Sequence, residues 1–520
     1  MNKMPKKSSS YWLQNKQRSY EPLKKDIDCD ICIVGGGIVG ITSAYLLTKL
    51  HYKVVLIDEG QVLSKTTGHT SAKMTVQHGV KYSELIQNLG ENEAKAYYEM
   101  NRTALEWMKE KIISDNLDCD YAEEAAYVYA LTESGLESLE AEYEAYNTLG
   151  IDGTFERDLP FNIEVKGALK LEEQGRFHPV KYCKALLEQA INRGLKVYEE
   201  TTAVNILDGE QQLVQTTSDY KIKANDVLIT SHYPFYEGKG MYMMYMMRMY
   251  PERSYVLCIK PKADLSKGMY INVESPARSV RKIDINGESA LLIVGEEHRT
   301  GDNINTMEKY DALYQFAVEQ FGIEKIYARW STQDMMTVSG MPYIGPLTRK
   351  DEHILVATGF NKWGMTNGTA AARLLVDYIT KQPIGSRQVF HPKHTYILRR
   401  FKAFAKQNKD VVAHLVKGKF EKGQVEIDEL QKNEAKIIRV DGERKGVYKN
   451  EVGDIFFVDT TCTHIGCEVN WNEAEKTWDC PCHGSRFSYD GEVLEGPAEK
   501  PLQTYDYKMI DNFLSKDSGY

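Results

Sequence analysis

Two segments near the C-terminus contain cysteine and histidine at spacings that suit a metal centre. Residues 462–467 read CTHIGC, and residues 480–485 read CPCHGS. Each segment offers one thiolate and one imidazole to a shared site. A [2Fe–2S] cluster can be held by two thiolates on one iron and two imidazoles on the other. The four candidate ligands are Cys462, His464, Cys480 and His483.

Tetrahedral zinc is the alternative, because two thiolates and two imidazoles also satisfy that metal. Zinc-binding loops usually pair C-x-x-C with H-x-H or H-x₃-H, whereas these segments combine C-x-H with C-x-x-H. Each segment also contains a further cysteine, Cys467 in the first and Cys482 in the second. These differences favour the two-iron cluster over zinc.

Residues 431–520 resemble the Rieske [2Fe–2S] domain family through both segments and through a later G-P-A turn at 496–498. The resemblance implies that the two candidate cysteines bind one iron and the two candidate histidines bind the other. The segments are most similar to the respiratory-type branch, in which each loop carries an additional cysteine. That likeness implies a disulfide between Cys467 and Cys482, which would tie the two loops together.

Two further residues of the second segment bear on the reduction potential of such a cluster. In the Rieske family a serine, here Ser485, donates a hydrogen bond to a bridging sulfide, and a tyrosine two residues later donates to a cysteine sulfur. This chain has Phe487 at the tyrosine position. Losing that donor favours the oxidised cluster, so we expect a potential below the upper end of the Rieske range of about −150 to +300 mV.

A glycine-rich turn near the N-terminus has the form of a dinucleotide site. Gly35-x-Gly37-x-x-Gly40 follows an apolar strand and opens a helix, and Asp58 ends the next strand, 18 residues after Gly40. The glycines permit a tight turn, close approach of a pyrophosphate and close packing of helix on strand. The phosphates would face the helix N-terminus, and Asp58 would accept hydrogen bonds from a ribose. The motif alone fits FAD and NAD equally.

Residues 28–385 resemble the D-amino-acid oxidase/glycine oxidase family of FAD-dependent oxidoreductases. The resemblance rests on the loop SKTTGHTSAK at 64–73, GRFHP at 175–179, MPYIGP at 341–346, and the glycine turns TGF at 358–360 and GMT at 364–366. It implies FAD as the cofactor. Beyond Gly35, Gly37, Gly40 and Asp58, it implies contacts from Thr67, Gly68, His69, Thr70, Val204, Gly359, Gly364 and Met365.

Catalytic residues are not defined by a motif, but two cations lie in the loop that is expected to run beside the flavin. His69 or Lys73 could stabilise a reduced, anionic ring, and mere solvation of the loop is the alternative reading. Some relatives attach the flavin through a cysteine near the segment that corresponds to residues 341–346. Because this chain has no cysteine between Cys258 and Cys462, we expect non-covalent FAD.

These resemblances predict an α/β Rossmann-like FAD-binding domain with an α+β substrate domain, followed by a small all-β Rieske domain. The oxidoreductase part would span 28–385, with its FAD portion at about 28–79, 170–235 and 335–385, and its substrate portion at about 80–169 and 236–334. A basic, helical linker would cover 386–430, and the Rieske domain 431–520.

The overall composition limits the kinds of binding partner and the cellular locations that we expect for this chain. The chain has 520 residues, a net charge of −9 and a pI near 5.8, which gives no electrostatic reason to expect nucleic-acid binding. The basic N-terminus lacks an apolar signal-peptide core, and no run approaches 18 apolar residues. We therefore expect a cytoplasmic protein without a transmembrane anchor.

Two redox centres in one chain indicate an electron relay. A small-molecule substrate, an amine or amino acid, would give a hydride to the flavin from a C–N bond, with a C–O bond as the alternative. A [2Fe–2S] cluster would then pass electrons singly to an external acceptor. On this interpretation the chain is a dehydrogenase. Two alternatives have no organic substrate: a module that feeds an oxygenase, and a redox sensor.

Overall fold

The computed structural model describes residues 4–14, 18–159, 163–236, 245, 247–263, 265–348, 352–394, 396, 405, 430–440 and 443–506. Most of the expected helical linker at 386–430 lies outside these residues. Its described beginning belongs to a 3₁₀ helix, η3 (Gly385–Phe390). Within the described residues, no helix is both long enough and apolar enough to cross a bilayer.

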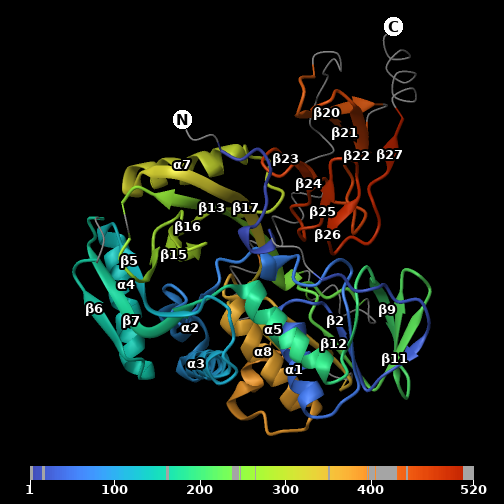
Figure 1. Cartoon of the computed structure of the whole chain (residues 1–520), viewed down its shortest axis with the longest axis horizontal. Coiled ribbons are helices and arrows are strands. Elements are labelled where there is room, and N and C mark those ends of the chain that lie inside the picture. Colours follow the sequence, from blue (N-terminus) through green and yellow to red (C-terminus); the bar gives the residue numbers. More distant parts are fainter. Residues whose placement is uncertain are drawn as a thin grey trace.

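A six-stranded sheet supports the glycine-rich turn, and two of its strands, β2 and β12, are labelled in the lower half of Figure 1. Its order is β18-β19-β12-β2-β3-β8, and all neighbours pair in parallel except β18 and β19. The strands are β2 (Ile31–Val34), β3 (Val54–Ile57), β8 (Lys196–Tyr198), β12 (Asp226–Ile229), β18 (Tyr343–Pro346) and β19 (Ile354–Thr358). Three chain segments, far apart in sequence, therefore build this sheet.

Both faces of that sheet are covered, which explains why its strands β2 and β3 are apolar and buried at every position. Ile31 and Ile33 of β2 face the core that holds helices α1 (Ile38–Lys49), α5 (Pro179–Asn192) and α8 (Gly364–Ile379). Cys32 and Val34 face a second core, shared with a four-stranded sheet. That smaller sheet consists of β1 (Ile27–Asp28), β11 (Lys221–Ala224), β10 (Gln212–Thr216) and β9 (Ala203–Leu207).

A nine-stranded sheet forms the second large unit, and helix α7 (Met307–Phe321) packs on its long strands. Its order is β17-β13-β16-β15-β14-β5-β7-β4, with β6 on β7. The bounds are β4 (Lys73–Met74), β5 (Ala122–Ala130), β6 (Gly153–Glu156), β7 (Gly167–Arg176), β13 (Met249–Pro261), β14 (Met269–Asn272), β15 (Ser279–Ile285), β16 (Glu288–Arg299) and β17 (Ile323–Thr337). The remaining helices of this half are α2 (Lys81–Leu89), α3 (Glu91–Ser114) and α4 (Glu133–Leu149).

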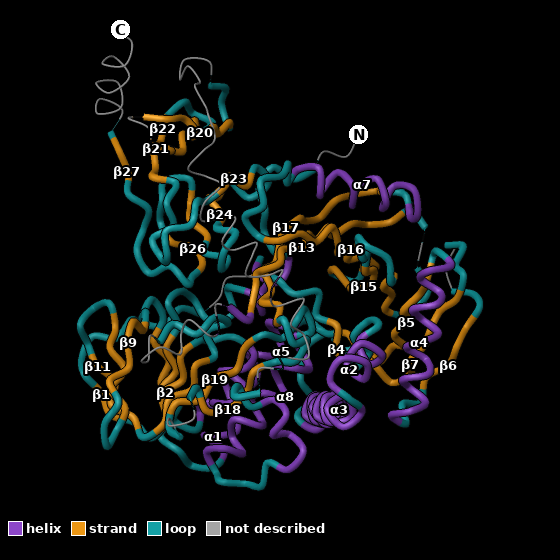
Figure 2. The backbone as a smooth tube through the Cα atoms, turned by 180° about the vertical axis from the view of Figure 1, so that it is seen from behind, coloured by secondary structure: helices purple, strands orange, loops and turns teal. Residues whose placement is uncertain are grey.

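The C-terminal part is a small all-β unit that stands beside β13 and β17 (Figure 2). One of its sheets contains β20 (Glu434–Val440), β21 (Glu443–Lys449), β22 (Ile455–Asp459) and β27 (Thr504–Tyr505). The other contains β23 (Asn470–Asn472), β24 (Thr477–Asp479), β25 (Arg486–Ser488) and β26 (Val493–Glu495). The predicted fold class is thus confirmed, while the predicted domain boundaries stay predictions.

Candidate active site and cluster site

A cavity of about 560 Å³ is lined by loops at the carboxyl ends of the six-stranded sheet, by the nine-stranded sheet and by residues 495–499 of the C-terminal unit. It collects eight of the predicted cofactor and catalytic residues: Gly35, Gly37, Asp58, Thr67, Thr70, Lys73, Gly364 and Met365. Five others are not among its lining residues: Gly40, Gly68, His69, Val204 and Gly359. Val204 lies on β9, directly after the lining residues Thr202 and Ala203.

The glycine turn has the geometry that a pyrophosphate site needs. Gly35 has φ +111°, and a Cβ at Gly40 would lie 2.0 Å from the Gly35 carbonyl oxygen, so Gly40 serves helix–strand packing instead of lining the cavity. Gly37 is the N-cap of α1 and has no side chain to cap the helix. Asp58 Oδ2 accepts a hydrogen bond from the Gly36 N–H at 2.7 Å. The N-terminus of α1 therefore faces the cavity, where its dipole favours a bound anion.

A second helix N-terminus opens onto the same space. Gly364 is the first residue of α8, and no heavy atom lies within 4 Å of a Cβ placed on it. At the N-terminus of α1, Thr67 Oγ1 accepts the Ile38 N–H at 3.1 Å. Two helix N-termini, small residues and an acid directly after β3 together fit an FAD molecule.

The two predicted catalytic candidates lie in different places. Lys73 is buried in the cavity wall, and its Nζ donates to the Tyr270 carbonyl oxygen at 3.1 Å. Burial, with a smaller contribution from the nearby Arg281 charge, lowers the pKa of Lys73 to about 7. The His69 ring is turned toward its own loop, with Nδ1 2.8 Å from the Lys65 carbonyl oxygen. Of the two, only Lys73 is among the residues that line the cavity.

Residues without any sequence motif complete the cavity. His78 stacks on Trp363 with 4.7 Å between ring centroids, and its Nδ1 lies 2.7 Å from the Tyr97 hydroxyl. Burial lowers the pKa of His78 to about 3, so the ring is neutral at physiological pH. Asp334, on β17, also lines the cavity. No local spacing in the sequence distinguishes these residues from ordinary core and strand positions.

The cluster segments form two adjacent loops in the C-terminal unit. Cys462 and Cys480 are each 1% exposed, and the His464 and His483 rings are 5.1 Å apart between centroids. The His483 Nδ1 atom is buried and has no hydrogen-bond partner among the described residues, as a metal-binding nitrogen would. These donors fit a [2Fe–2S] cluster, and the assignment of each ligand stays a prediction.

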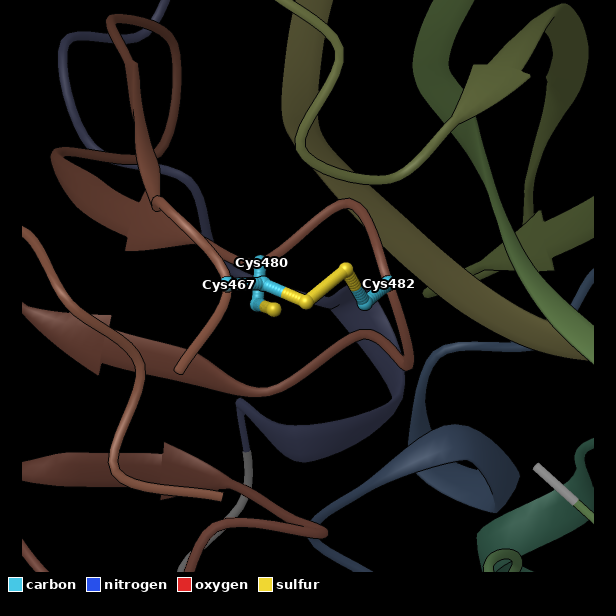
Figure 3. A group of neighbouring side chains, drawn as sticks. All are labelled: Cys467, Cys480 and Cys482. Carbon is cyan, nitrogen blue, oxygen red and sulfur yellow. A yellow bond between two sulfur atoms is a disulfide. The ribbon is translucent and has the colours of Figure 1, made fainter. Parts of the chain in front are cut away.

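A disulfide joins the two loops, as the sequence resemblance implies. The Cys467 and Cys482 sulfurs are bonded at 2.00 Å. Figure 3 shows this bond beside Cys480, whose sulfur lies within 4.8 Å of both disulfide sulfurs. The Ser485 hydroxyl oxygen accepts the Ala498 N–H at 3.0 Å, which ties the second loop to the G-P-A turn.

Comparison with known proteins gives the family. The family model for FAD dependent oxidoreductases matches residues 30–378, and the model for the Rieske [2Fe–2S] domain matches residues 424–506. The chain belongs to the FAD-dependent oxidoreductases and carries a Rieske domain. The protein is therefore an enzyme of a family that binds FAD, and its C-terminal domain is of a family that binds a [2Fe–2S] cluster.

Individual relatives support both parts. The chain is 44% identical to the Bacillus subtilis protein YhfW, a Rieske 2Fe-2S iron-sulfur protein by name, over 96% of this chain and 97% of that protein. It is 23% identical to the gamma-glutamylputrescine oxidoreductase of Escherichia coli over 72% of this chain and 90% of that one. The glycine oxidase structure from Geobacillus kaustophilus, 18% identical, superposes with a TM-score of 0.60 over 70% of this chain and 98% of that one.

The second cluster loop of the Rieske domain packs against the oxidoreductase body. Gln333 Nε2 donates to the Gly484 carbonyl oxygen at 2.9 Å, and Arg299 Nε donates to the Pro481 carbonyl oxygen at 2.8 Å. A Cβ at Gly301 would lie 2.4 Å from the Pro481 nitrogen, so the body and this loop are in close contact.

A buried charge network lies under the same interface. Arg253 of β13 is 1% exposed, with its Nε 3.8 Å from Asp479 and an Nη 3.9 Å from Glu495. Arg486 lies 3.3 Å from each of those carboxylates. The Rieske domain contributes one arginine and two acids to this network, and Arg253 of the oxidoreductase body supplies the second positive charge.

Tyr233 lies between the FAD cavity and the cluster loops. It follows β12, lines the cavity and is 5% exposed. Its ring centroid is 6.3 Å from that of His464 and 6.2 Å from that of His483. The preceding residue, His232, also lines the cavity and has φ +67°, an uncommon backbone conformation for a residue other than glycine. The flavin and cluster sites thus share one wall, which sequence reasoning did not anticipate.

Proposed function

We propose that this oxidoreductase accepts a hydride from a small amine or amino-acid-like substrate and delivers the electrons singly, through its Rieske domain, to an external acceptor. When bound, FAD supplies two-electron oxidation of a C–N bond, and the cluster supplies one-electron transfer. The observation that carries the proposal is the shared wall, in which Tyr233 lines the FAD cavity and also contacts both candidate imidazole ligands.

The chain's own residues support a direction for the transfer. Every residue of the loop 480–485 is buried, so water is excluded between the body and His483. In the other loop Thr463, Ile465 and Gly466 are exposed. We therefore assign the buried loop to electron entry and the exposed loop to contact with the acceptor.

The cavity also suits handling of a substrate proton. With a pKa of about 7, Lys73 Nζ can gain or lose a proton near neutral pH while it stays hydrogen-bonded to the Tyr270 carbonyl. The amine or amino-acid class is supported by the names of relatives, a gamma-glutamylputrescine oxidoreductase and a glycine oxidase. The individual FAD contacts, the four iron ligands and a cytoplasmic location belong to the same proposal.

Anaerobic rapid mixing of the holoenzyme with a panel of amines and amino acids tests this function. The expected result is loss of the oxidised-flavin absorption, followed by the EPR signal of the reduced Rieske cluster. A panel member that bleaches the flavin while the cluster stays oxidised contradicts the relay. If no member bleaches it and the cluster is reduced only by a partner protein, the chain is an electron-transfer module without its own organic substrate.

A further inference from the structure

Asp334 stands apart from the other charged side chains around the FAD cavity. It lies on β17 between Gln333, which contacts the Rieske domain, and Met335, which is in the core. Asp334 is among the residues that line the cavity. Among the described residues, the Asp334 carboxylate has no hydrogen bond and no ion pair. Lys362 and Glu252 lie near enough to act on it electrostatically.

The lysines of the cavity wall already have partners. Lys362 Nζ lies 2.7 Å from Glu252, Lys81 Nζ lies 3.3 Å from Glu84, and Lys65 pairs with Glu59. The fourth, Lys73, donates to a backbone carbonyl. The wall therefore has no lysine in an ion pair with Asp334.

Other acids of the wall are satisfied in different ways. Asp58 accepts the Gly36 and Gly60 N–H groups at 2.7 and 2.9 Å. Glu297 accepts the Ala277 N–H at 3.3 Å, and Glu495 pairs with arginines at the domain interface. Among the residues that the structure describes, Asp334 has no comparable donor and no ion-pair partner, and Lys362, whose charge acts on it, is already paired with Glu252.

A carboxylate in such a place attracts a cation and repels an anion, because interactions between charges strengthen where water is excluded. A bound alkylammonium group would supply a direct ion-pair partner and N–H donors for this carboxylate. A substrate carboxylate next to Asp334 would meet like charge. The same position in a site built for amino-acid carboxylates would need a cation instead.

We propose that Asp334 binds the cationic nitrogen of the substrate, so that the site selects alkylamines without a carboxylate over zwitterionic amino acids. This inference rests on the proposed function only for the statement that the cavity holds the substrate. Burial raises the pKa of Asp334 to about 6, and the Lys362 charge opposes that rise, so the side chain is mostly ionised at pH 7. The carboxylate is therefore in its cation-binding form under ordinary conditions.

Equilibrium binding to the oxidised, anaerobic holoenzyme tests the inference without turnover. The probes are n-butylamine, butyrate and L-2-aminobutyrate, which share a carbon skeleton and differ in charge, with affinities taken from flavin difference spectra and calorimetry. We expect n-butylamine to bind most tightly. Asp334→Asn should weaken it by about 30-fold, the effect of removing one member of a buried charge pair, and should leave butyrate no weaker.

A matched control separates this effect from net charge. Asp284 lies on β15 of the same sheet, is exposed, and accepts the Gly287 N–H. Asp284→Asn makes the same change in net charge and should leave the affinity for n-butylamine unchanged. FAD content and the circular dichroism of each variant check that it folds. An unchanged affinity in Asp334→Asn, or tighter binding of L-2-aminobutyrate by the wild type, overturns the proposal.

The pH dependence gives a second readout. Asp334 gains a proton as the pH falls through about 6, so the wild-type affinity for n-butylamine should fall about tenfold from pH 7 to pH 5. Glu252, Glu495, Lys362 and Arg253 also act on Asp334 electrostatically, and Lys73, with a pKa of about 7, adds positive charge to the cavity over the same range. The comparison with Asp334→Asn isolates the aspartate, since that variant keeps all five groups. An equally steep fall in Asp334→Asn contradicts the assignment.

Failure of this inference and failure of the proposed function give different results. If amino acids reduce the flavin and then the cluster without any need for Asp334, the relay stands and the cationic-amine selectivity falls. If n-butylamine binds through Asp334 but no amine reduces the cluster, the selectivity stands and the relay falls.

Discussion

The two cluster loops of the Rieske domain carry equivalent candidate ligands and have opposite surroundings. The loop 462–467 exposes Thr463, Ile465 and Gly466, with Ile465 37% exposed. The loop 480–485 is buried throughout and packs on the body. The difference indicates that one side of the cluster is committed to the partner within the chain, while the other remains open to a partner outside it.

The comparison predicts that the ligands themselves are equally necessary. His464→Ala and His483→Ala should each abolish the Rieske EPR signal and the bound iron, because a [2Fe–2S] cluster cannot keep its histidine-bound iron on one imidazole. The FAD content should stay unchanged in both, which iron analysis and flavin absorption would show together. A variant of either loop that keeps a full complement of iron would refute the ligand assignment.

Disrupting the buried contact between the second cluster loop and the oxidoreductase body should lower the free energy of unfolding. Arg253→Met removes one arginine from a network with Asp479 and Glu495 and leaves Arg486 to balance both acids. Losing one partner of a buried ion pair destabilises by about 3 kcal/mol. Urea unfolding followed by Rieske absorption should show this loss, and hydrogen exchange should rise in residues 480–485. Unchanged exchange in that loop would mean that the network does not hold the domains together.

A pair of glycines gives a finer test of the same contrast. Gly484 has φ +81° and Gly466 has φ +83°, so alanine carries similar backbone strain at both. A Cβ on Gly484 would meet Pro251 at 2.7 Å, whereas nothing lies within 4 Å of one on Gly466. Gly466→Ala should cost about 1 kcal/mol of unfolding free energy, and Gly484→Ala about 1 to 3 kcal/mol more. Equal losses would show that the second loop is not pressed against the body.

Much of the fold and of both cofactor sites could be predicted from the sequence, because their signals are local. The glycine turn at Gly35 and Gly37 lies between β2 and α1 as expected, with Gly40 in the first turn of α1, and the Cys467–Cys482 disulfide was implied by the Rieske resemblance. A strand–glycine–helix unit and a pair of ligand-bearing loops carry their chemistry within a few residues. Such local patterns can be recognised in the sequence without knowing which residues pack around them.

The wall between the two sites could not be predicted in that way. Arg253 and Asp334 are single charged residues within long strands, and only tertiary packing brings them to the interface and the cavity. Tyr233 had a weak signal, since ligands in α/β sheets bind beyond the carboxyl ends of strands and it follows the end of β12. Nothing in its neighbours along the chain indicates the histidine rings on its far side.

The central claim, that electrons cross from the flavin site to the cluster at Tyr233, is tested most directly by internal electron transfer. The flavin is photoreduced anaerobically, and cluster reduction is followed in the wild type, Tyr233→Phe and Tyr233→Leu, after their cluster potentials are shown to match. We predict that phenylalanine, which keeps the ring between the two sites, preserves the wild-type rate, and that leucine slows transfer by an order of magnitude. Transfer at the wild-type rate in Tyr233→Leu, with FAD and cluster both intact, would contradict the account.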